Sequence, residues 1–399
     1  MRWLQVALVC ALLGCVTLAV NLQVPLYTRY VAGGQAAVAQ TSLIFCTYVF
    51  GLMPAFLLLA GASDRLGRKP VALIALACAL VATWIVLLKP TMPVLLAARL
   101  LQGVGVGLGM GTCTAYISEI LDDRAAASRL VALISSLGFG SGALLTATLL
   151  DWIPDDSELS YRAYLLSAGA IWTLCLVFAP WLKPSGGRLL RAPDFASRSL
   201  LPHYSIALGW AVSGVAIAII PSQLRRHGME NAVGGVVFAI ILAGVCAQPL
   251  ARRLGGVKSL LLGYACIPVG FTMLLGGSLL GNLSLLLLGA AIAGSASYGF
   301  TYLGGLETAL RDAEASGEAR AVAGFMVFAY LGFGLPSLTF GYAVAYWTAA
   351  LGIAWRFPTL CPTSGWPRAT MEVTVAMRSC SVVLTASTAE STRWSSMRS

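Results

Sequence analysis

Long apolar stretches separated by short polar ones run along most of the chain. A helix needs about 20 mostly apolar residues to cross a bilayer, and eleven stretches have that length and character. Glycine, serine and other small residues recur within them, as close helix packing in lipid favours. The pattern therefore predicts eleven membrane-spanning helices, at residues 4–26, 37–60, 70–88, 93–117, 128–150, 162–182, 203–222, 232–250, 258–279, 283–305 and 321–345.

Composition supports an integral membrane protein. Of the 399 residues, 58% are hydrophobic and 11% are charged, whereas about a quarter of a soluble domain is charged. The net charge of +10 is explained by basic cytoplasmic loops, so no nucleic-acid partner is expected. Most of the ten cysteines lie in apolar runs, where the thiol behaves as a small hydrophobe, and their spacing fits no metal site.

The distribution of Lys and Arg predicts a cytoplasmic N-terminus, because basic residues concentrate on the inner side of a membrane. We therefore expect a multi-pass protein of the cell's inner (plasma) membrane. With this orientation the outer loops carry Arg29, Lys89, Arg162, Arg225 and Arg226. The inner segments carry about three times as many: Arg2, Arg65, Arg68, Lys69, Arg124, Arg129, Lys183, Arg188, Arg191, Arg198, Arg252, Arg253, Lys258, Arg311 and Arg320.

The predicted helices fall into two related halves. A polar stretch at 183–202, rich in Pro, Gly, Ser and Arg, reads as a cytoplasmic linker between bundles at 1–182 and 203–345. Six helices are recognised in the first bundle and five in the second. Short matches in the same order and at a nearly constant offset indicate a parallel repeat, a known plan for transporters. The matches pair 64–67 with 252–255, Glu119 with Glu307, and 137–140 with 331–334.

Three motifs carry a resemblance to a known family. The loop at 61–70, GASDRLGRKP, resembles the signature between helices two and three of the major facilitator superfamily. Residues 99–105, RLLQGVG, resemble the family's helix-four motif, and residues 116–119 are similar to a segment of its sugar-porter branch. The resemblance implies an all-α fold of two six-helix bundles that moves a small molecule by alternating access. It covers the first half closely and the second through the repeat.

Six residues of the loop at 61–70 form the predicted cytoplasmic gate. Gly61 lets a neighbouring helix approach its backbone. Asp64 is placed to pair with the positive N-terminal end of another helix, which the resemblance implies is the eleventh, beginning near Ala321. The loop's basic residues are expected to hold it against the anionic leaflet. An ordinary basic topology anchor is the alternative. The six residues are Gly61, Asp64, Arg65, Gly67, Arg68 and Lys69.

Polar groups inside the spans are functional candidates by default. Arg99 lies several residues inside the fourth helix, with Gln102 and Gly103 about one turn further in. We expect Arg99 to face a central cavity and either couple to a proton or bind an anionic substrate; alternatively it reaches the outer interface. Asn21 and Gln23, near the outer end of the first helix, either line the cavity or bond neighbouring helices.

The tenth helix carries a polar, aromatic stripe, and the resemblance implies that this helix lines the cavity. Its candidate substrate contacts are Ser297, Tyr298, Thr301 and Tyr302, with Tyr204 and Trp210 of the seventh helix as weaker candidates. The acidic residues Asp64, Glu119 and Glu307 lie at the cytoplasmic ends of helices and none lies mid-span. A simple carboxylate proton relay is therefore not supported, and the coupling ion stays open.

The expected function is ion-gradient-driven export of a small molecule by a monomer, with the proton as the first candidate coupling ion. The glycine-rich fifth helix, at 138–142, partly matches an antiporter motif, and Pro336 lies in its second-half counterpart. Uptake of a sugar or organic acid, favoured by 116–119, and a non-transporting remnant are the alternatives. We find no enzyme motif, no catalytic or metal-ligand cluster and no phosphate-binding loop, so no cofactor is expected.

The end of the chain differs from the rest. A twelfth helix should follow residue 345, but roughly the last 45 residues, from Arg356, contain Arg, Ser, Thr, Trp, Cys and Pro without a sustained apolar run, and residues 346–399 are assigned to an aberrant tail. This composition is typical of an out-of-frame reading of a GC-rich gene, and a disordered tail is the alternative. The twelfth helix is therefore expected to be missing or degraded.

Overall fold

The computed structural model describes residues 2–33, 38–59, 61–184, 186, 200–312 and 318–354. Packing divides the chain into two compact units, residues 1–341 and 342–399, of which the second is described only as far as Ala354. Most of the predicted linker, residues 185 and 187–199, lies outside the described residues, and so do residues 355–399 of the predicted tail. The described part is helical and contains no strand.

The apolar runs of the first half form helices whose ends fall close to the predicted ones, with polar or Gly and Pro residues between them. Two short helical elements, η1 and α2, follow the first span, and the short helix α4 precedes the third span. The elements are α1 (Arg2–Leu22), η1 (Val24–Leu26), α2 (Tyr27–Ala32), α3 (Val38–Leu58), α4 (Ala62–Leu66), α5 (Arg68–Leu88), α6 (Met92–Leu121), α7 (Arg124–Trp152) and α8 (Leu159–Phe178).

The second half continues in the same way, with one irregularity. A π-helical turn, η2, interrupts the tenth span and separates it into α12 and α13. The elements are α9 (Leu201–Arg226), α10 (Ala232–Leu254), α11 (Gly256–Leu280), α12 (Leu283–Gly294), η2 (Ser295–Thr301), α13 (Tyr302–Asp312) and α14 (Glu318–Ala354).

Eleven segments of the described chain are long and apolar enough to cross a membrane, and each overlaps one of the eleven predicted spans. The prediction of an all-α membrane fold is therefore confirmed. One boundary differs: α14 continues to Ala354, past residue 345, where the aberrant tail was predicted to begin. The helix continues because residues 346–354 are still mostly apolar and include several alanines, which favour helix.

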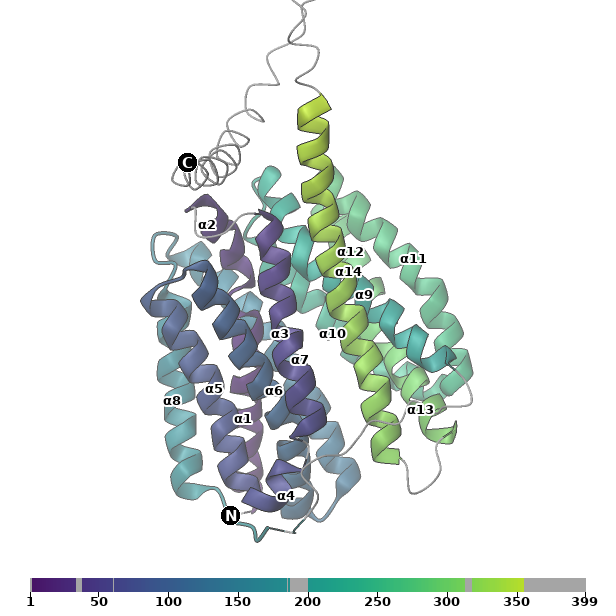
Figure 1. The fold of residues 1–399 in the computed structure, drawn as a ribbon. Coiled ribbons are helices and arrows are strands. Elements are labelled where there is room, and N and C mark those ends of the chain that lie inside the picture. The colour runs from purple at the N-terminus through teal and green to yellow at the C-terminus, as the bar shows by residue number, and fades with distance from the viewer. Residues whose placement is uncertain are drawn as a thin grey trace, which may run out of the picture. The chain divides into compact units, whose positions relative to one another are not determined.

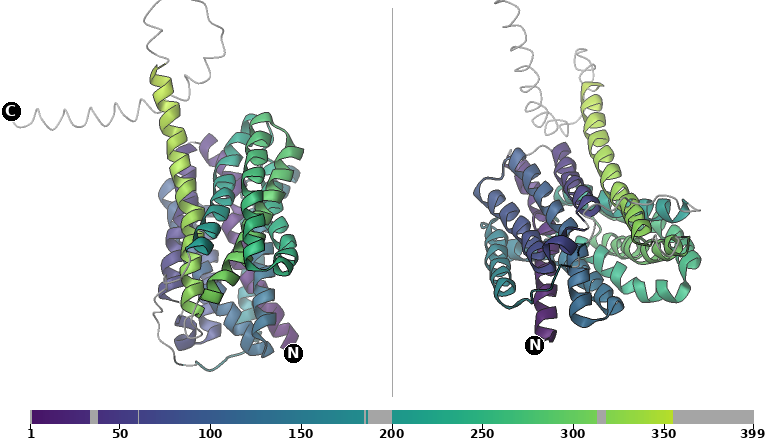
Figure 2. Two further views of the ribbon diagram at one scale, coloured as in Figure 1. Left: turned by 90° about the vertical axis from the view of Figure 1, so that its right-hand side faces the viewer. Right: turned by 60° about the horizontal axis from the view of Figure 1, so that its bottom comes forward.

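Within residues 1–341 the helices pack in two groups. In the first, α1 packs on α6 and α7, α3 on α6, and α5 on α6 and α8; in the second, α11 packs on α12, and α10 on η2 and α12. The groups meet where α7 and α10 pack along each other. Figure 1 shows α2 at one end of the helices and α4 and α13 at the other, and the turned views of Figure 2 show the blue and green groups side by side.

The sequence repeat has a structural counterpart in two turns. Gly67 between α4 and α5 has φ of +94°, and Gly255 between α10 and α11 has φ of +76°. Each glycine is the N-cap of the following helix, and only glycine adopts such a backbone without strain. The same turn thus connects the second and third spans of each half.

Candidate functional site

A cavity of about 170 Å³ lies between the two groups of helices. The first half contributes residues from α1, α3, α6 and α7, and the second contributes residues from α9, α10, η2, α13 and α14. The lining residues are Val20, Asn21, Phe45, Tyr48, Phe56, Met110, Ala132, Ser135, Ser136, Phe139, Trp210, Ile217, Ile241, Gln248, Tyr298, Tyr302, Met326, Tyr330 and Phe333.

The wall of the cavity is aromatic and uncharged. Nine of its lining residues are Phe, Tyr or Trp, and none is Asp, Glu, Lys, Arg or His. The rings contact one another: the Trp210 centroid lies 5.3 Å from that of Tyr298 and 5.2 Å from that of Tyr330. Phe45 of α3 and Phe333 of α14 meet across the halves with centroids 5.0 Å apart. Such a wall suits flat, apolar molecules held by a few polar groups.

The cavity lies toward the end of the helices that carries α4. Ala132, near the start of α7, and Gln248, near the end of α10, both line it there. At the opposite end the same two helices are in contact. A Cβ atom at Gly234 of α10 would lie 2.5 Å from the carbonyl oxygen of Ala143 and 2.6 Å from the Cβ atom of Ala147, so the two helices are in close contact at this end.

The repeated stretch Leu-Gly-Phe-Gly has the same role in both halves. Phe139 of α7 and Phe333 of α14 each line the cavity. The glycine after each faces the opposite half: Gly140 contacts Phe238 of α10, and Gly334 contacts Val49 of α3. The Sγ atom of Cys46 in α3 also lies 3.0 Å from the carbonyl oxygen of Gly334. The repeat therefore provides a matching pair of cavity rings and helix contacts.

Arg99 is completely buried in the first half, beside the cavity. One guanidinium nitrogen, Nη1, donates to the carbonyl oxygen of Val20 and, at 3.2 Å, to Oε1 of Gln102. The guanidinium carbon lies 5.7 Å from the ring centroids of both Phe45 and Tyr48 and 5.9 Å from that of Tyr27. Three electron-rich faces thus surround the cation.

The remaining edge of the Arg99 guanidinium has no partner among the described residues. Nε and Nη2 make no hydrogen bond, and neither does the nearby hydroxyl of Tyr27. Buried polar groups are seldom left unpaired, so this edge is an unusual feature of the fold.

Gln23 and Gln102 belong to this cluster, and Asn21 makes a separate contact. Gln23 donates from Nε2 to Oε1 of Gln102 at 3.0 Å, and Gln102 donates to the carbonyl oxygen of Ala19 at 3.2 Å. Asn21 donates to the carbonyl oxygen of Phe139 on α7 at 2.8 Å. Of these three, only Asn21 lines the cavity. Gln23 and Gln102 instead tie α1 to α6.

Two expectations for the fourth span differ from the structure. Arg99 was expected to face the cavity, but it is not among the lining residues, since its side chain turns toward α1 and lies behind Phe45 and Tyr48. Gly103 is not in the cavity wall either. A Cβ atom there would overlap the carbonyl oxygen of Tyr48, so this glycine lets α6 cross close to α3.

The predicted polar stripe of the tenth span divides into two faces. Tyr298 and Tyr302 line the cavity, whereas Ser297 and Thr301 do not. The Ser297 hydroxyl donates to the carbonyl oxygen of Gly209 in α9 at 2.5 Å, and the Thr301 hydroxyl donates within its own helix at 2.8 and 3.0 Å. The π-helical turn sets the two faces apart, and the serine and threonine serve packing rather than the cavity.

The aromatic residues of the seventh span and of two other spans differ from the expectation. Trp210 lines the cavity, but Tyr204 is largely exposed, with its ring against that of Phe328. Sequence analysis did not identify the rings contributed by α3 and α14 as cavity residues, because an aromatic residue in a span is equally compatible with lipid contact. A spacing of one helical turn, as between Phe45 and Tyr48, was the available signal.

The predicted gate loop forms a compact charged cluster at the α4 end. Arg68 binds Asp64 at 2.5 Å and Glu119 of α6 at 2.7 Å, and it donates to the Ser63 hydroxyl at 2.7 Å. The backbone carbonyl of Asp64 accepts a hydrogen bond from the amide of Gly186 at 3.1 Å. Asp64, Arg68 and Glu119, separate in the sequence, are therefore brought together.

The expected contact of the loop's basic residues with the lipid leaflet is corrected for two of them. Lys69 is buried; it donates to the carbonyl oxygen of Ala179 at 2.8 Å, and its Nζ lies 4.8 Å from the ring centroid of Trp181. Arg68 is held by the acidic cluster, and only Arg65 is exposed. The turn at Gly67 starts α5 immediately, which directs both side chains into the protein.

Glu307, the second acidic residue predicted at the cytoplasmic end of a helix, has an ion-pair partner on its own helix. Glu307 of α13 pairs with Arg311 one turn further along the same helix. Its carboxyl carbon would also lie 3.7 Å from a Cβ atom at Gly256, next to the repeated turn of the second half. Glu307 therefore occupies a place like that of Glu119 relative to its own half, with a different ion-pair partner.

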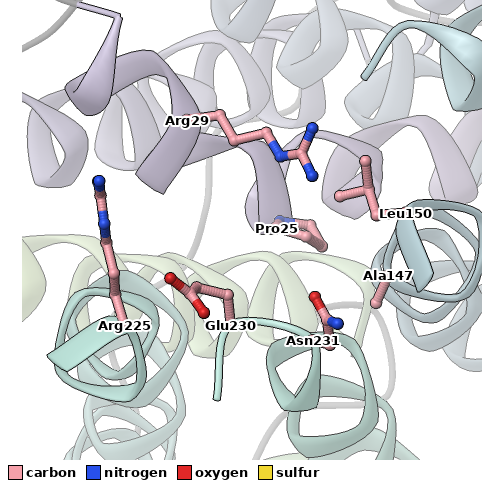
Figure 3. Close-up of a pocket in the computed structure, with 7 residues that line it drawn as sticks. All are labelled: Pro25, Arg29, Ala147, Leu150, Arg225, Glu230 and Asn231. Carbon is pink, nitrogen blue, oxygen red and sulfur yellow. The ribbon is translucent and has the colours of Figure 1, made fainter. Parts of the chain in front are cut away.

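A second pocket, of about 250 Å³, lies at the end of the helices that carries α2. Figure 3 shows Arg29 reaching over it from α2, with Arg225, Glu230 and Asn231 on the side of α9 and α10. Arg29 also donates to the carbonyl oxygen of Pro154 at 2.7 Å. Across the described residues no group of three or more His, Cys, Asp or Glu side chains is placed to hold a metal ion.

Comparison with known proteins agrees with this architecture. A family model described as Major Facilitator Superfamily matches residues 6–337. The chain belongs to the Major Facilitator Superfamily. The predicted family is thereby confirmed, and the chain is a multi-pass membrane protein of a transporter family that moves small molecules.

Curated relatives match only part of the chain. Multidrug resistance protein MdtL of Escherichia coli (strain K12 / DH10B) and of Shigella boydii serotype 18 are each 36% identical to it over 96 residues. The matched stretch is 24% of this chain and 25% of each relative, so the chain spans about a quarter of the length of the curated relatives it matches.

Solved structures match over nearly the whole chain. The nucleoside transporter NupG, in a mutant form, aligns with a TM-score of 0.68 and 14% identity, covering 87% of this chain and 92% of its own. A bacterial homologue of the human lysosomal transporter Spinster, inward-facing and unoccupied, gives 0.66 and 16%, covering 90% and 86%. A D-xylose-proton symporter gives 0.61 and 17%, covering 85% and 88%. These likenesses concern the fold.

Proposed function

We propose that this member of the Major Facilitator Superfamily exports small, flat, largely apolar molecules by alternating access, driven by an ion gradient. The observation that carries the proposal is the cavity, because both halves of the chain line it and nine of its lining residues are aromatic. A site shared by two halves changes its access when the halves rock against each other. The partial match to a multidrug resistance protein favours export.

The proposed orientation places the N-terminus and α4 in the cytoplasm, in the inner membrane of the cell. The excess of Lys and Arg in the segments at this end supports it. The cavity lies toward the same end, and α7 and α10 are in close contact at the opposite end. An exporter takes up its substrate from the cytoplasm, so this conformation is the one that would load.

The cluster of Asp64, Arg68 and Glu119 is proposed as the cytoplasmic gate. It connects α4, α5 and α6 at the end toward which the cavity lies. Partly exposed ion pairs are suited to breaking and reforming during a conformational change. Whether the pair is formed or broken, each charged group stays in contact with water or with a partner and is not exposed to lipid. The protein is proposed to work as a monomer, with the halves of one chain as the moving parts.

The proton is the first coupling ion to test, although no carboxylate lies in the cavity wall. Uptake of an organic acid is the second candidate function. The observation in its favour is the unpartnered edge of Arg99, which lies beside the cavity and matches a carboxylate in shape and charge.

The deciding experiment is dye accumulation in exporter-deficient bacterial cells that produce the protein, with and without a protonophore. Export predicts lower accumulation than in cells without the protein, and proton coupling predicts that the protonophore removes the difference. Trp210→Ala, in the cavity wall, should lose most of this activity, whereas Trp84→Ala, exposed on α5, should keep it at equal membrane levels. Unchanged accumulation for every dye would contradict broad export.

A further inference from the structure

We propose that the cavity selects organic anions, and that the free edge of Arg99 is a carboxylate-binding site reached from it. The inference rests on the proposed transport function and adds the substrate class: an aromatic molecule with one carboxylate. Nothing in the cavity wall is charged, so selection by charge has to come from a residue behind it. Arg99 occupies that place.

The charge of Arg99 is uncompensated within the membrane. By sequence, the spans contain only three acidic residues, Glu119, Asp151 and Glu307, and all lie at span ends. Around the guanidinium the structure places carbonyl and amide oxygens and three aromatic rings. These neighbours solvate the cation without cancelling its charge. Its positive potential therefore extends into the adjacent low-dielectric cavity.

The geometry of the unpartnered atoms matches a carboxylate. Nη1 makes both hydrogen bonds of the side chain, and Nε and Nη2 make none. Nε and Nη2 point along the same edge of the planar guanidinium, which is the edge that binds two carboxylate oxygens in parallel. The Tyr27 hydroxyl also has no hydrogen-bond partner by geometry; its ring centroid lies 5.9 Å from the guanidinium carbon, and it provides a third donor.

The rings of Phe45 and Tyr48 lie between the cavity and the guanidinium of Arg99. Phe45 and Tyr48 contact the guanidinium on one side and line the cavity on the other. In the proposed binding mode, one of these two rings rotates so that the cavity and the guanidinium become connected. The aromatic part of a ligand would then stack in the cavity while its carboxylate pairs with Arg99. A lipophilic cation gains the same stacking but is repelled by the charge.

The size of the effect follows from Coulomb's law. A unit charge about 10 Å from the ligand, at an effective dielectric constant of about 20, changes affinity on the order of tenfold. An anion is expected to bind about tenfold more tightly than a neutral molecule of the same shape, and a cation about tenfold more weakly. A direct pair with the free edge increases the first difference further.

The experiment uses three probes of one shape: 2-naphthoate, 2-naphthamide and 2-naphthylmethylammonium. Binding to the purified full chain in detergent is measured by isothermal titration calorimetry. The wild-type protein should prefer naphthoate over naphthamide by about tenfold or more, with the ammonium weakest. Arg99→Gln should remove this order and leave naphthamide binding unchanged. Arg99→Lys keeps the positive charge but loses the two parallel N–H donors, so it should retain only part of the preference for naphthoate.

Controls separate charge selection from folding and from transport. Arg162→Gln, which removes an exposed arginine paired with Asp156, should keep the wild-type order. Equal affinities of all three probes, or a naphthoate preference that survives Arg99→Gln, would overturn the inference while leaving the transport proposal intact. Absence of binding by any probe alongside active dye export would overturn the inference alone. Absence of both would overturn both proposals.

Discussion

Arg68 shows how a single side chain can join elements that the sequence keeps apart. It lies in the first turn of α5, pairs with Asp64 of α4 and reaches Glu119 at the end of α6. The side chains of Arg68 and Asp64 are only 11% and 13% exposed, so their attraction is screened less than that of a surface pair. The neighbouring Arg65 is exposed and provides a matched comparison.

Arg68→Gln is expected to destabilise the protein by about 1–3 kcal/mol, because two partly buried carboxylates lose their common partner. Arg65→Gln should change stability by less than about 0.5 kcal/mol, as at most surface positions. Thermal unfolding of both purified variants in detergent, at low and high salt, measures the difference. Equal unfolding temperatures for the two variants would show that the cluster contributes nothing to this conformation.

At the scale of elements, close crossing of two helices depends on glycines, because a glycine has no side chain to keep the backbones apart. Gly103 lies where α6 crosses α3, and a Cβ atom there would overlap the carbonyl oxygen of Tyr48 and lie 2.7 Å from the amide nitrogen of Leu52. Gly51 has the reciprocal position, facing the carbonyl of Leu100. Without a hydrophobic driving force in lipid, such close backbone contact is a main source of helix association.

Gly103→Ala is expected to lower stability by about 1–3 kcal/mol, because the added methyl group must push the two helices apart. Gly111→Ala, on the same helix with no atom within 4 Å of the added Cβ, should be neutral or slightly stabilising through helix propensity. Unfolding temperatures in the same detergent give the comparison. A smaller loss at Gly103 than at Gly111 would contradict the close crossing.

For the whole molecule, the contact between α7 and α10 joins the two halves away from the cavity. Gly234 of α10 rests against Ala143 and Ala147 of α7, whereas its neighbour Gly235 has no atom within 4 Å of an added Cβ. Rocking of the halves in alternating access requires this contact to open. The same substitution at each of these two adjacent glycines therefore distinguishes an effect on the interface between α7 and α10 from an effect on helix α10 itself.

Gly234→Val is expected to open this end and shift the population away from the conformation described. Hydrogen–deuterium exchange of the first two turns of α10 and the last two of α7 should rise, because opening exposes their amides. Gly235→Val should leave exchange in α7 as in the wild-type protein. Unchanged exchange in Gly234→Val would mean that the interface tolerates the added bulk and is looser than the structure indicates.

The sequence by itself determined the eleven spans, their repeat and the family, because apolar length, loop charge and turn motifs are local properties. It also identified most of the cluster around Arg99 as polar groups within spans. Only the tertiary structure decided which faces meet. The differences that place Tyr298 in the cavity and the adjacent Ser297 against α9, or that bury Lys69 and expose Arg65, depend on helix rotation and crossing. In a lipid environment apolar faces turn both inward and outward, so hydrophobicity alone does not fix that rotation.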